Sequence, residues 1–213
     1  NNPDGTLLLP LLEHSIRPSD IHNPPTRLIC LENTHNFCQG SPLNPEYMDS
    51  VRALAAKYGL KIHLDGARLF NAAVAQDINV KDLTRQADSV MFCLSKGLSA
   101  PVGSLVCSNR DFIQRARKFR KMVGGGMRQA GHLAAAGLVA LESLVERLKE
   151  DHQNTQLLAE QLASVEGIEL DPAQVKTNII FFKLKHSKID GESFLNLLEE
   201  NSIKILMTDP GVF

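Results

Sequence analysis

The sequence of 213 residues contains no apolar run that approaches the roughly 20 residues a membrane-spanning helix requires. It also lacks net charge: the formal value is -1 at pH 7, which argues against a nucleic-acid or acidic-membrane binder. Internal repeats and low-complexity segments are absent as well. With 43% apolar and 22% charged residues, the composition is that of an ordinary soluble globular protein.

Cysteine is scarce, with four residues and no closely spaced pair. This excludes a disulfide scaffold and a zinc site of the usual spacing, and it indicates a reducing compartment. Cys30, Cys93 and Cys107 lie within apolar runs, where we expect small buried side chains. Together with a polar start that has no secretory leader, the pattern predicts a cytoplasmic protein.

The most informative stretch is a short apolar run between Asp88 and Ser95, which predicts a buried strand. Lys96 and Gly97 follow at its end, where open α/β sheets place ligands. A lysine held among apolar residues and a tight turn loses solvation, so its pKa falls and its free amine becomes a nucleophile. Such an amine forms a Schiff base with a carbonyl substrate or with pyridoxal phosphate. The alternative is a surface lysine that only caps the strand.

A second predicted strand, residues 27–31, ends in the polar sequence Glu-Asn-Thr-His-Asn at 32–36. A loop that uses asparagine for its backbone geometry explains Asn33 and Asn36 but not His35. We therefore treat His35 as a candidate functional residue.

A third predicted strand, residues 61–65, ends at Asp65, and Arg68 follows just after it. His63 and Asp65 share one face of this strand, so a metal site is conceivable. No third ligand is spaced to join them, and we expect no metal.

Helical patterns at residues 45–58, 69–75 and 80–87 separate these strands, and a further strand is predicted at 104–107. This alternation predicts an α/β fold with a largely parallel sheet that is covered on both faces.

A basic amphipathic helix is predicted at 110–123, and the glycine-rich sequence 124–129 follows it. The basic residues fit a solvated face, an anion site or a subunit contact. The glycines do not form a phosphate loop of the Walker type, because no Gly-Lys-Ser/Thr follows. A glycine run with Arg128 at a helix start can still clamp an anion.

The last part of the chain returns to a small α/β pattern after a helical stretch at 129–163. Strands are predicted at 177–184 and 203–207, and a helix at 191–200. We expect residues 1–150 to belong to a large domain and residues 151–213 to a smaller, incomplete one.

Pyridoxal phosphate requires a lysine, a carboxylate that keeps its ring nitrogen protonated, a phosphate site, and an arginine for a substrate carboxylate. Lys96, Asp65, Arg68 and Arg128 are residue types that fill these roles.

Four motifs resemble those of the low-specificity L-threonine aldolase family, in order and with compatible spacing. They are Leu-Glu-Asn-Thr-His-Asn at 31–36, His-Leu-Asp-Gly-Ala-Arg at 63–68, Ser-Lys-Gly-Leu with Ala-Pro-Val-Gly at 95–103, and Gly-Gly-Gly-Met-Arg-Gln at 124–129. The resemblance implies the fold of the aspartate aminotransferase class of pyridoxal-phosphate enzymes (fold type I). It also implies a homotetramer with active sites between paired subunits.

Carried over residue by residue, the resemblance implies that Lys96 binds the cofactor and Asp65 partners its ring nitrogen. Arg68 joins the substrate-carboxylate site, and His35 lies near the substrate hydroxyl as a base or as its holder. Arg128 reaches the cofactor phosphate of the neighbouring subunit, and Lys121 is a further substrate-site candidate nearby.

The implied reaction is cleavage of L-threonine or L-allo-threonine to glycine and acetaldehyde. One alternative is a catalytically inactive truncated fragment of such an enzyme. Another is a different pyridoxal-phosphate enzyme, such as a serine hydroxymethyltransferase-like or β-eliminating lyase.

The chain also departs from the family pattern. The family's ring-stacking histidine and its phosphate-binding Gly-Thr turn precede the Asn-Thr-His motif, and neither His14 nor His22 matches that histidine. A second carboxylate-binding arginine is expected beyond Phe213. We therefore expect a fragment that lacks the N-terminal part and the C-terminal end of the family's proteins.

Overall fold

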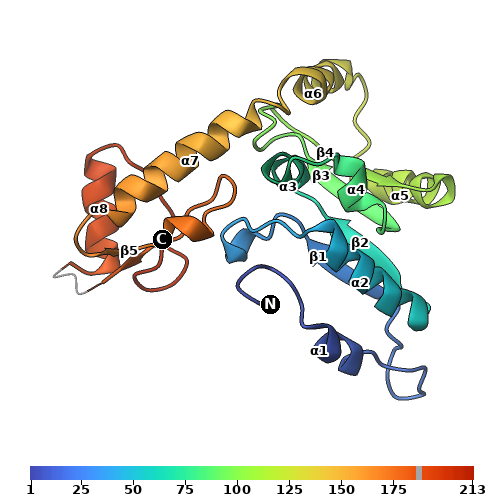
Figure 1. Cartoon of the computed structure of the whole chain (residues 1–213). Coiled ribbons are helices and arrows are strands. Elements are labelled where there is room, and N and C mark those ends of the chain that lie inside the picture. Colours follow the sequence, from blue (N-terminus) through green and yellow to red (C-terminus); the bar gives the residue numbers. More distant parts are fainter. Residues whose placement is uncertain (186–188) are drawn as a thin grey trace.

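The computed structural model of the chain describes residues 1–185 and 189–213, and its centre is a four-stranded sheet (Figure 1). The strands follow one another in space in chain order: β1 (Leu28–Glu32), β2 (Lys61–Asp65), β3 (Ser89–Cys93) and β4 (Ser104–Ser108). The first three are parallel, and β4 runs antiparallel to β3. The predicted α/β fold with a largely parallel sheet is confirmed.

Helices cover one face of this sheet because alternate strand residues are apolar. They are α2 (Pro45–Lys57), α3 (Leu69–Gln76) and α4 (Val80–Thr84). Ile62 and Leu64 of β2 are fully buried against them, in one core that also contains Met48 of α2 and Leu83 of α4.

The opposite face is only partly covered in the described residues, so the expectation of two covered faces is confirmed only in part. Helix α5 (Arg110–Met122) lies along β4, while Leu28 of β1 remains 48% exposed. The three cysteines that were predicted to be buried are not: Cys30 and Cys107 are exposed, and Cys93 is only partly buried.

The predicted helix at 129–163 is two helices, α6 (Gly131–Ser143) and α7 (Leu148–Ala163). Both pack on the connection between β3 and β4. Leu94 and Leu98 of that connection form a second core with Ala140 of α6 and Leu148 of α7.

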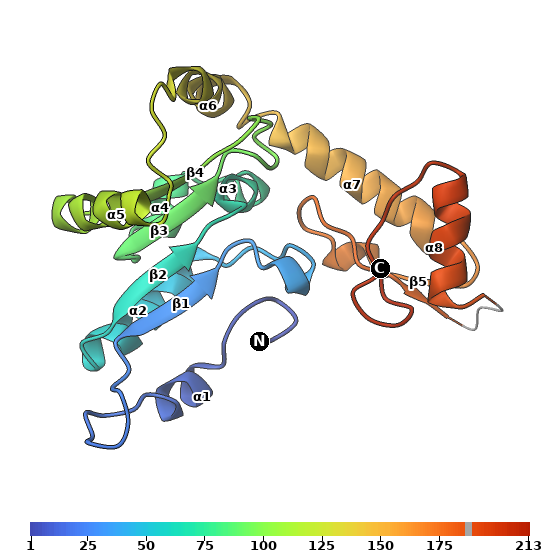
Figure 2. The same ribbon diagram turned by 180° about the vertical axis from the view of Figure 1, so that it is seen from behind.

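The N-terminal segment contains the short helix α1 (Leu9–His14). The Tyr47 hydroxyl on α2 anchors this segment: it accepts from the Leu7 amide at 2.8 Å and donates to the Leu7 carbonyl at 3.1 Å. Seen from behind, the segment runs alongside β1 (Figure 2).

The C-terminal part lies at the far end of α7 in both views (Figures 1 and 2). It contains the two-stranded antiparallel pair β5 (Ile168–Glu169) and β6 (Lys183–Leu184), and helix α8 (Gly191–Glu200), which has the predicted bounds.

Two strand predictions in this part are wrong. Residues 177–182 are not in a strand, because Thr177 turns to the N-terminal half and donates its hydroxyl to the Gly40 carbonyl at 2.7 Å. Residues 203–207 form no strand either. Phe182 belongs instead to a local aromatic cluster, in which its ring stacks on that of Phe213 at 5.3 Å.

No helix in the described part of the chain has both the length and the apolar character needed to cross a membrane.

Three elements are joined by an ion-pair network at the start of β3. Asp88 accepts from Arg52 Nη2 at 2.8 Å, from Lys61 Nζ at 3.0 Å and from the Ile62 amide at 2.9 Å. Burial alone would raise the pKa of Asp88, but hydrogen bonds from these three donors outweigh it and lower the pKa to about 2.

We predict that Asp88→Asn lowers the free energy of unfolding at neutral pH by about 1–2 kcal/mol, because charged donors lose their acceptor. The folded-state pKa of Asp88 lies below the unfolded value of 3.8, so its contribution is present above that value. It is lost as the pH falls toward 2. Urea unfolding of parent and variant at pH 7 and at lower pH down to about 2 measures the difference, which should shrink below pH 3.8. Asp49→Asn, at an exposed pair with Arg85, is the matched control and should cost less. Equal unfolding midpoints for parent and Asp88→Asn would contradict the prediction.

Candidate active site

The carboxyl ends of β1, β2 and β3 meet at one edge of the sheet. Parallel pairing sets Glu32 beside Asp65, and Asp65 beside Met91. Backbone hydrogen bonds continue the pairing past the strand ends, from the Asn33 amide to the Asp65 carbonyl and from the Gly66 amide to the Met91 carbonyl, both at 2.8 Å. The loops that carry the predicted residues therefore leave the sheet from one edge.

His35 lies in the loop after β1, and its side chain is 12% exposed. Its Nε2 is 2.6 Å from Asn1 Nδ2 and 3.8 Å from Glu32 Oε2. An amide nitrogen only donates, so Nε2 accepts and the neutral ring carries its proton on Nδ1. Nδ1 is buried and has no hydrogen-bond partner in the described chain. A buried polar atom without a partner is costly, so the hydrogen bonding of the His35 ring is incomplete in the described chain.

The arginine and the carboxylate of the second motif stand close to this loop. Arg68 donates from Nη1 to Asn36 Oδ1 at 3.0 Å, which ties it to the residue after His35. Asp65 is exposed, and its Oδ1 accepts from the Ala67 amide at 3.1 Å. The other oxygen of Asp65 takes no hydrogen bond from any described residue and is available to a ligand.

Lys96 lies in the turn after β3, as predicted, but its setting differs from the prediction. Leu94 and Leu98 are buried on either side, whereas Lys96 is exposed. The expectation that apolar neighbours withdraw its amine from water is therefore wrong for the described chain. Those neighbours instead fix the turn, which the Ser99 amide closes on the Lys96 carbonyl at 2.8 Å.

Lys121 and Arg128 are not brought to this edge. Both are exposed, and no contact joins either one to His35, Asp65 or Lys96 among the described residues. The Lys121 amine lies beside Gly126, at the turn that follows α5. Their predicted roles depend on a neighbouring subunit and stay predictions.

A hollow of about 290 Å³ lies at this edge of the sheet. Its lining comes from β1, from the strand ends and from the N-terminal segment: Asn1, Gly5, Leu7, Cys30, Leu31, Glu32, His35 and Asp65. Asn1, Gly5 and Leu7 were not among the predicted site residues, so this wall was missed.

Gly5 shows how the N-terminal segment is fitted to the site. Its φ is +82°, and a Cβ at this position would lie only 2.8 Å from His35 Cβ. No side chain fits there, so glycine lets the segment pass directly over the histidine. The Asp4-Gly5 dipeptide is a turn signal that could have revealed the fold-back, although not its destination.

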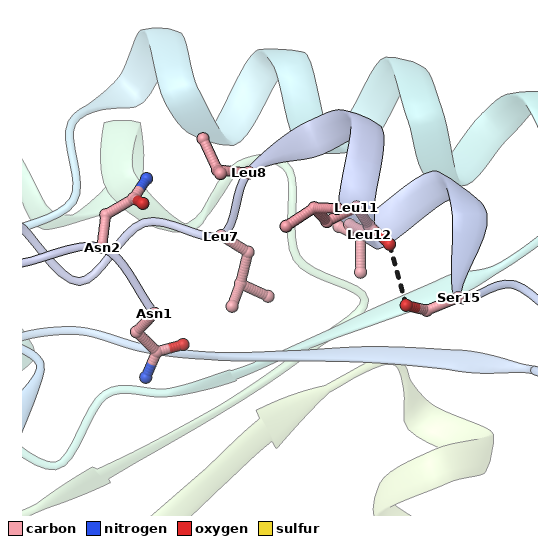
Figure 3. A pocket seen from close by; sticks show the side chains of 7 residues that line it. All are labelled: Asn1, Asn2, Leu7, Leu8, Leu11, Leu12 and Ser15. Atoms are coloured by element: carbon pink, nitrogen blue, oxygen red, sulfur yellow. Dashed lines mark hydrogen bonds between the residues drawn. The ribbon is translucent and has the colours of Figure 1, made fainter.

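A larger hollow of about 420 Å³ lies between the N-terminal segment and α1 (Figure 3). Apolar side chains dominate it, among them Leu8, Leu11 and Leu12. The Ser15 hydroxyl in its lining donates a hydrogen bond to the Leu11 carbonyl at 2.8 Å. It lacks the ionisable side chains of the smaller hollow, so size alone does not make it the reactive site.

Solved structures of two proteins share this architecture. A threonine aldolase from Leishmania major aligns with a TM-score of 0.72 at 20% identity, over 99% of this chain and 60% of that one. A PLP-dependent aminotransferase from Streptococcus suis aligns with a TM-score of 0.72 at 19% identity, over 98% and 55%. The fold is thus that of the pyridoxal-phosphate-dependent aminotransferase-like α/β proteins.

Sequence comparison identifies the family. The model of the beta-eliminating lyase family matches residues 1–185, and the chain belongs to that family. It is 46% identical over 209 residues to low-specificity L-threonine aldolase 1 of Arabidopsis thaliana, covering 97% of this chain and 58% of the relative. It is 48% identical over 181 residues to the low specificity L-threonine aldolase of Escherichia coli K12, covering 85% and 53%. The chain thus spans somewhat more than half the length of these relatives.

The match begins at the first residue, although the motifs that suggested the family begin only at residue 31. The N-terminal segment that lines the hollow is therefore part of the region that the family model matches.

We predict that Gly5→Ala destabilises the fold by about 1–2 kcal/mol, because it combines a positive φ with a clash against His35. Gly59→Ala is a matched control: its φ is +65°, but a Cβ there meets nothing within 4 Å. The difference between the two variants in chemical unfolding isolates the contact with His35. Equal destabilisation would show that the N-terminal segment does not press on the histidine.

Proposed function

We propose that the protein containing this chain is a pyridoxal-phosphate-dependent lyase that cleaves L-threonine or L-allo-threonine to glycine and acetaldehyde. The convergence of His35, Asp65 and Arg68 at one sheet edge, with Lys96 on the adjoining strand's exit, carries the proposal. The relatives named as L-threonine aldolases support the choice of substrate.

The residues at this edge fit the cofactor. Lys96 offers an exposed amine for its aldehyde carbon, and Asp65 offers an exposed carboxylate with one free oxygen for its ring nitrogen. When bound, the cofactor supplies an electron sink for the negative charge that forms at the substrate Cα. A carboxylate beside the ring nitrogen keeps that nitrogen protonated and so maintains the sink.

Arg68 binds the substrate carboxylate in this proposal. A guanidinium binds a carboxylate through two parallel hydrogen bonds, which fix orientation as well as position. Asn36 already holds one end of the Arg68 guanidinium, so little side-chain freedom remains to be lost on binding.

His35 handles the proton of the substrate hydroxyl, because loss of that proton must accompany cleavage of the Cα–Cβ bond. The acceptor atom is Nε2, reached directly or through a water, where the Asn1 amide now donates. Glu32 Oε2, 3.8 Å from Nε2, stabilises the imidazolium that forms. A histidine that only orients the hydroxyl would use the same atom.

The assembly and the domains complete the proposal. We infer a cytoplasmic homotetramer in which Arg128 reaches the cofactor phosphate of a neighbouring subunit and Lys121 lies near the substrate. The exposure of both residues supports this role. We further infer a large domain over residues 1–150 and a smaller one over 151–213, which the two separate sheets support. The boundary falls within α7.

A β-elimination reaction is the second candidate, because the matching family model is named for it. The two reactions differ in the bond broken: β-elimination of serine releases pyruvate and ammonia, whereas aldol cleavage of threonine releases acetaldehyde and glycine. Assays of acetaldehyde and of pyruvate on the same purified protein separate them. Pyruvate release without acetaldehyde would overturn the aldolase proposal.

We predict that Lys96→Ala in the complete protein abolishes the borohydride-reducible bond to the cofactor and the visible absorption band that accompanies it. Mass spectrometry of the reduced parent should place the adduct on Lys96. Lys81→Ala is a control on an exposed lysine of α4 and should leave the bond intact. An adduct on another lysine would refute the assignment.

We predict that Asp65→Asn lowers threonine cleavage by roughly a hundredfold to a thousandfold, because it removes the charge that holds the ring nitrogen protonated. Cofactor binding should persist in part, since the shape of the side chain is retained. Steady-state acetaldehyde release measures the loss, and Asp82→Asn on α4 serves as the charge-matched control. Turnover near that of the parent would show that another group sets the ring charge.

A further inference from the structure

A buried polar pair lies behind the turn that carries Lys96. Asn71 of α3 is 3% exposed, and its Nδ2 is 3.1 Å from Nε2 of His152 on α7. The amide nitrogen donates, so Nε2 accepts and the neutral ring carries its proton on Nδ1. Burial lowers the pKa of His152, against a smaller opposing effect of Asp151, which favours this neutral acceptor state.

The oxygen end of the same amide faces the lysine turn. A Cβ built on Gly97 would lie 3.3 Å from Asn71 Oδ1 and 2.8 Å from Leu148 Cδ2. The backbone next to Lys96 therefore rests on Asn71 and Leu148 more closely than any other residue would permit. The turn has no freedom to move toward α3 or α7 without displacing one of these side chains.

Asn71 thus connects three parts of the structure that bear on the site. It lies in the first turn of α3, three residues after Arg68, and it touches the lysine turn on one side and α7 on the other. A side chain needed only for volume would be apolar here, because burying an amide costs free energy unless it is hydrogen-bonded. The bond to His152 meets that need and also fixes which way the amide points.

We propose that Asn71, oriented by His152, is a positioning residue that holds the turn of Lys96 at a fixed position relative to Asp65 and Arg68. This inference rests on the proposed function, because it takes Lys96 to be the lysine that binds the cofactor. Asn71 acts through the backbone of Gly97 and touches no reacting atom. Through Asn71 and His152, the backbone beside Lys96 is therefore linked to α7.

The first test uses the cofactor-free complete protein and measures amide hydrogen exchange of residues 95–101. Asn71→Leu keeps the volume but removes the hydrogen bond, and it should speed exchange of this turn roughly tenfold. His152→Leu should act in the same direction. His152→Gln retains a side-chain oxygen that accepts from Asn71, so its exchange should stay close to that of the parent.

Two control variants separate positioning from general destabilisation. Leu83→Ala opens a cavity in the main core, and Gln153→Ala alters the exposed surface of α7. Leu83→Ala should lower the melting temperature without selectively speeding exchange at 95–101, and Gln153→Ala should change neither. If Leu83→Ala loosens the turn as much as Asn71→Leu does, the turn only reports global stability and the proposal is overturned.

The second test uses the cofactor-loaded protein. The pH midpoint of the visible band reports the environment of the lysine, and Asn71→Leu should shift it by about half a pH unit or more relative to the parent. Gly97→Ala keeps both polar residues but pushes the turn away from Leu148, and it should speed exchange at 95–101 as well. It therefore tests the contact even if Asn71→Leu does not fold.

The outcomes also separate this inference from the proposed function. A visible band that survives Lys96→Ala would overturn the lyase assignment, while the exchange measurement would still test the contact of Asn71 with the turn. A band that is lost in Lys96→Ala but keeps its pH midpoint in Asn71→Leu, with unchanged exchange at 95–101, would overturn the positioning role alone.

Discussion

The parallel pairing of β1, β2 and β3 is the constraint on which the site depends. Parallel strands bring their carboxyl ends to the same edge, so Glu32 and Asp65, 33 positions apart, and Asp65 and Met91, 26 positions apart, become neighbours. Glu32 pairs in register with Asp65, and the loops beyond them carry His35 and Arg68. A shift of register by one residue would turn Asp65 toward the helical layer and bury a carboxylate in the core.

Close backbone packing fixes the loops that this pairing brings together. The Lys96 turn rests on Asn71 and Leu148, and the N-terminal segment rests on His35 through Gly5. At both places a glycine stands where a side chain would collide. The reactive side chains can therefore be exposed while the backbone beneath them is held by buried groups, and such support is what precise positioning requires.

The central strands and helices could be read from the sequence because apolar periodicity and capping residues agreed there. The predicted bounds of α8 are those observed, and β2 matches as well. The strand predicted at 177–184 is wrong over residues 177–182, because Thr177 donates a tertiary hydrogen bond to Gly40, 137 positions away, which no local pattern encodes. The N-terminal wall of the site was missed for the same reason: the turn signal at Asp4-Gly5 is local and does not indicate that the segment lies over His35. The exposure of Lys96 also depends on what covers the sheet, which short-range patterns do not encode.

The partly open face of the sheet bears directly on the chemistry. Electrostatic stabilisation of a developing charge is strongest where water is excluded, yet Lys96 and Asp65 are both exposed in this chain. The chain contains the residue types that the proposed cofactor and substrate require, and it spans only 58% of the Arabidopsis relative. In the described chain the turn after β3 therefore supplies position rather than burial: Leu94 and Leu98 anchor it in the second core, while Lys96 between them stays exposed.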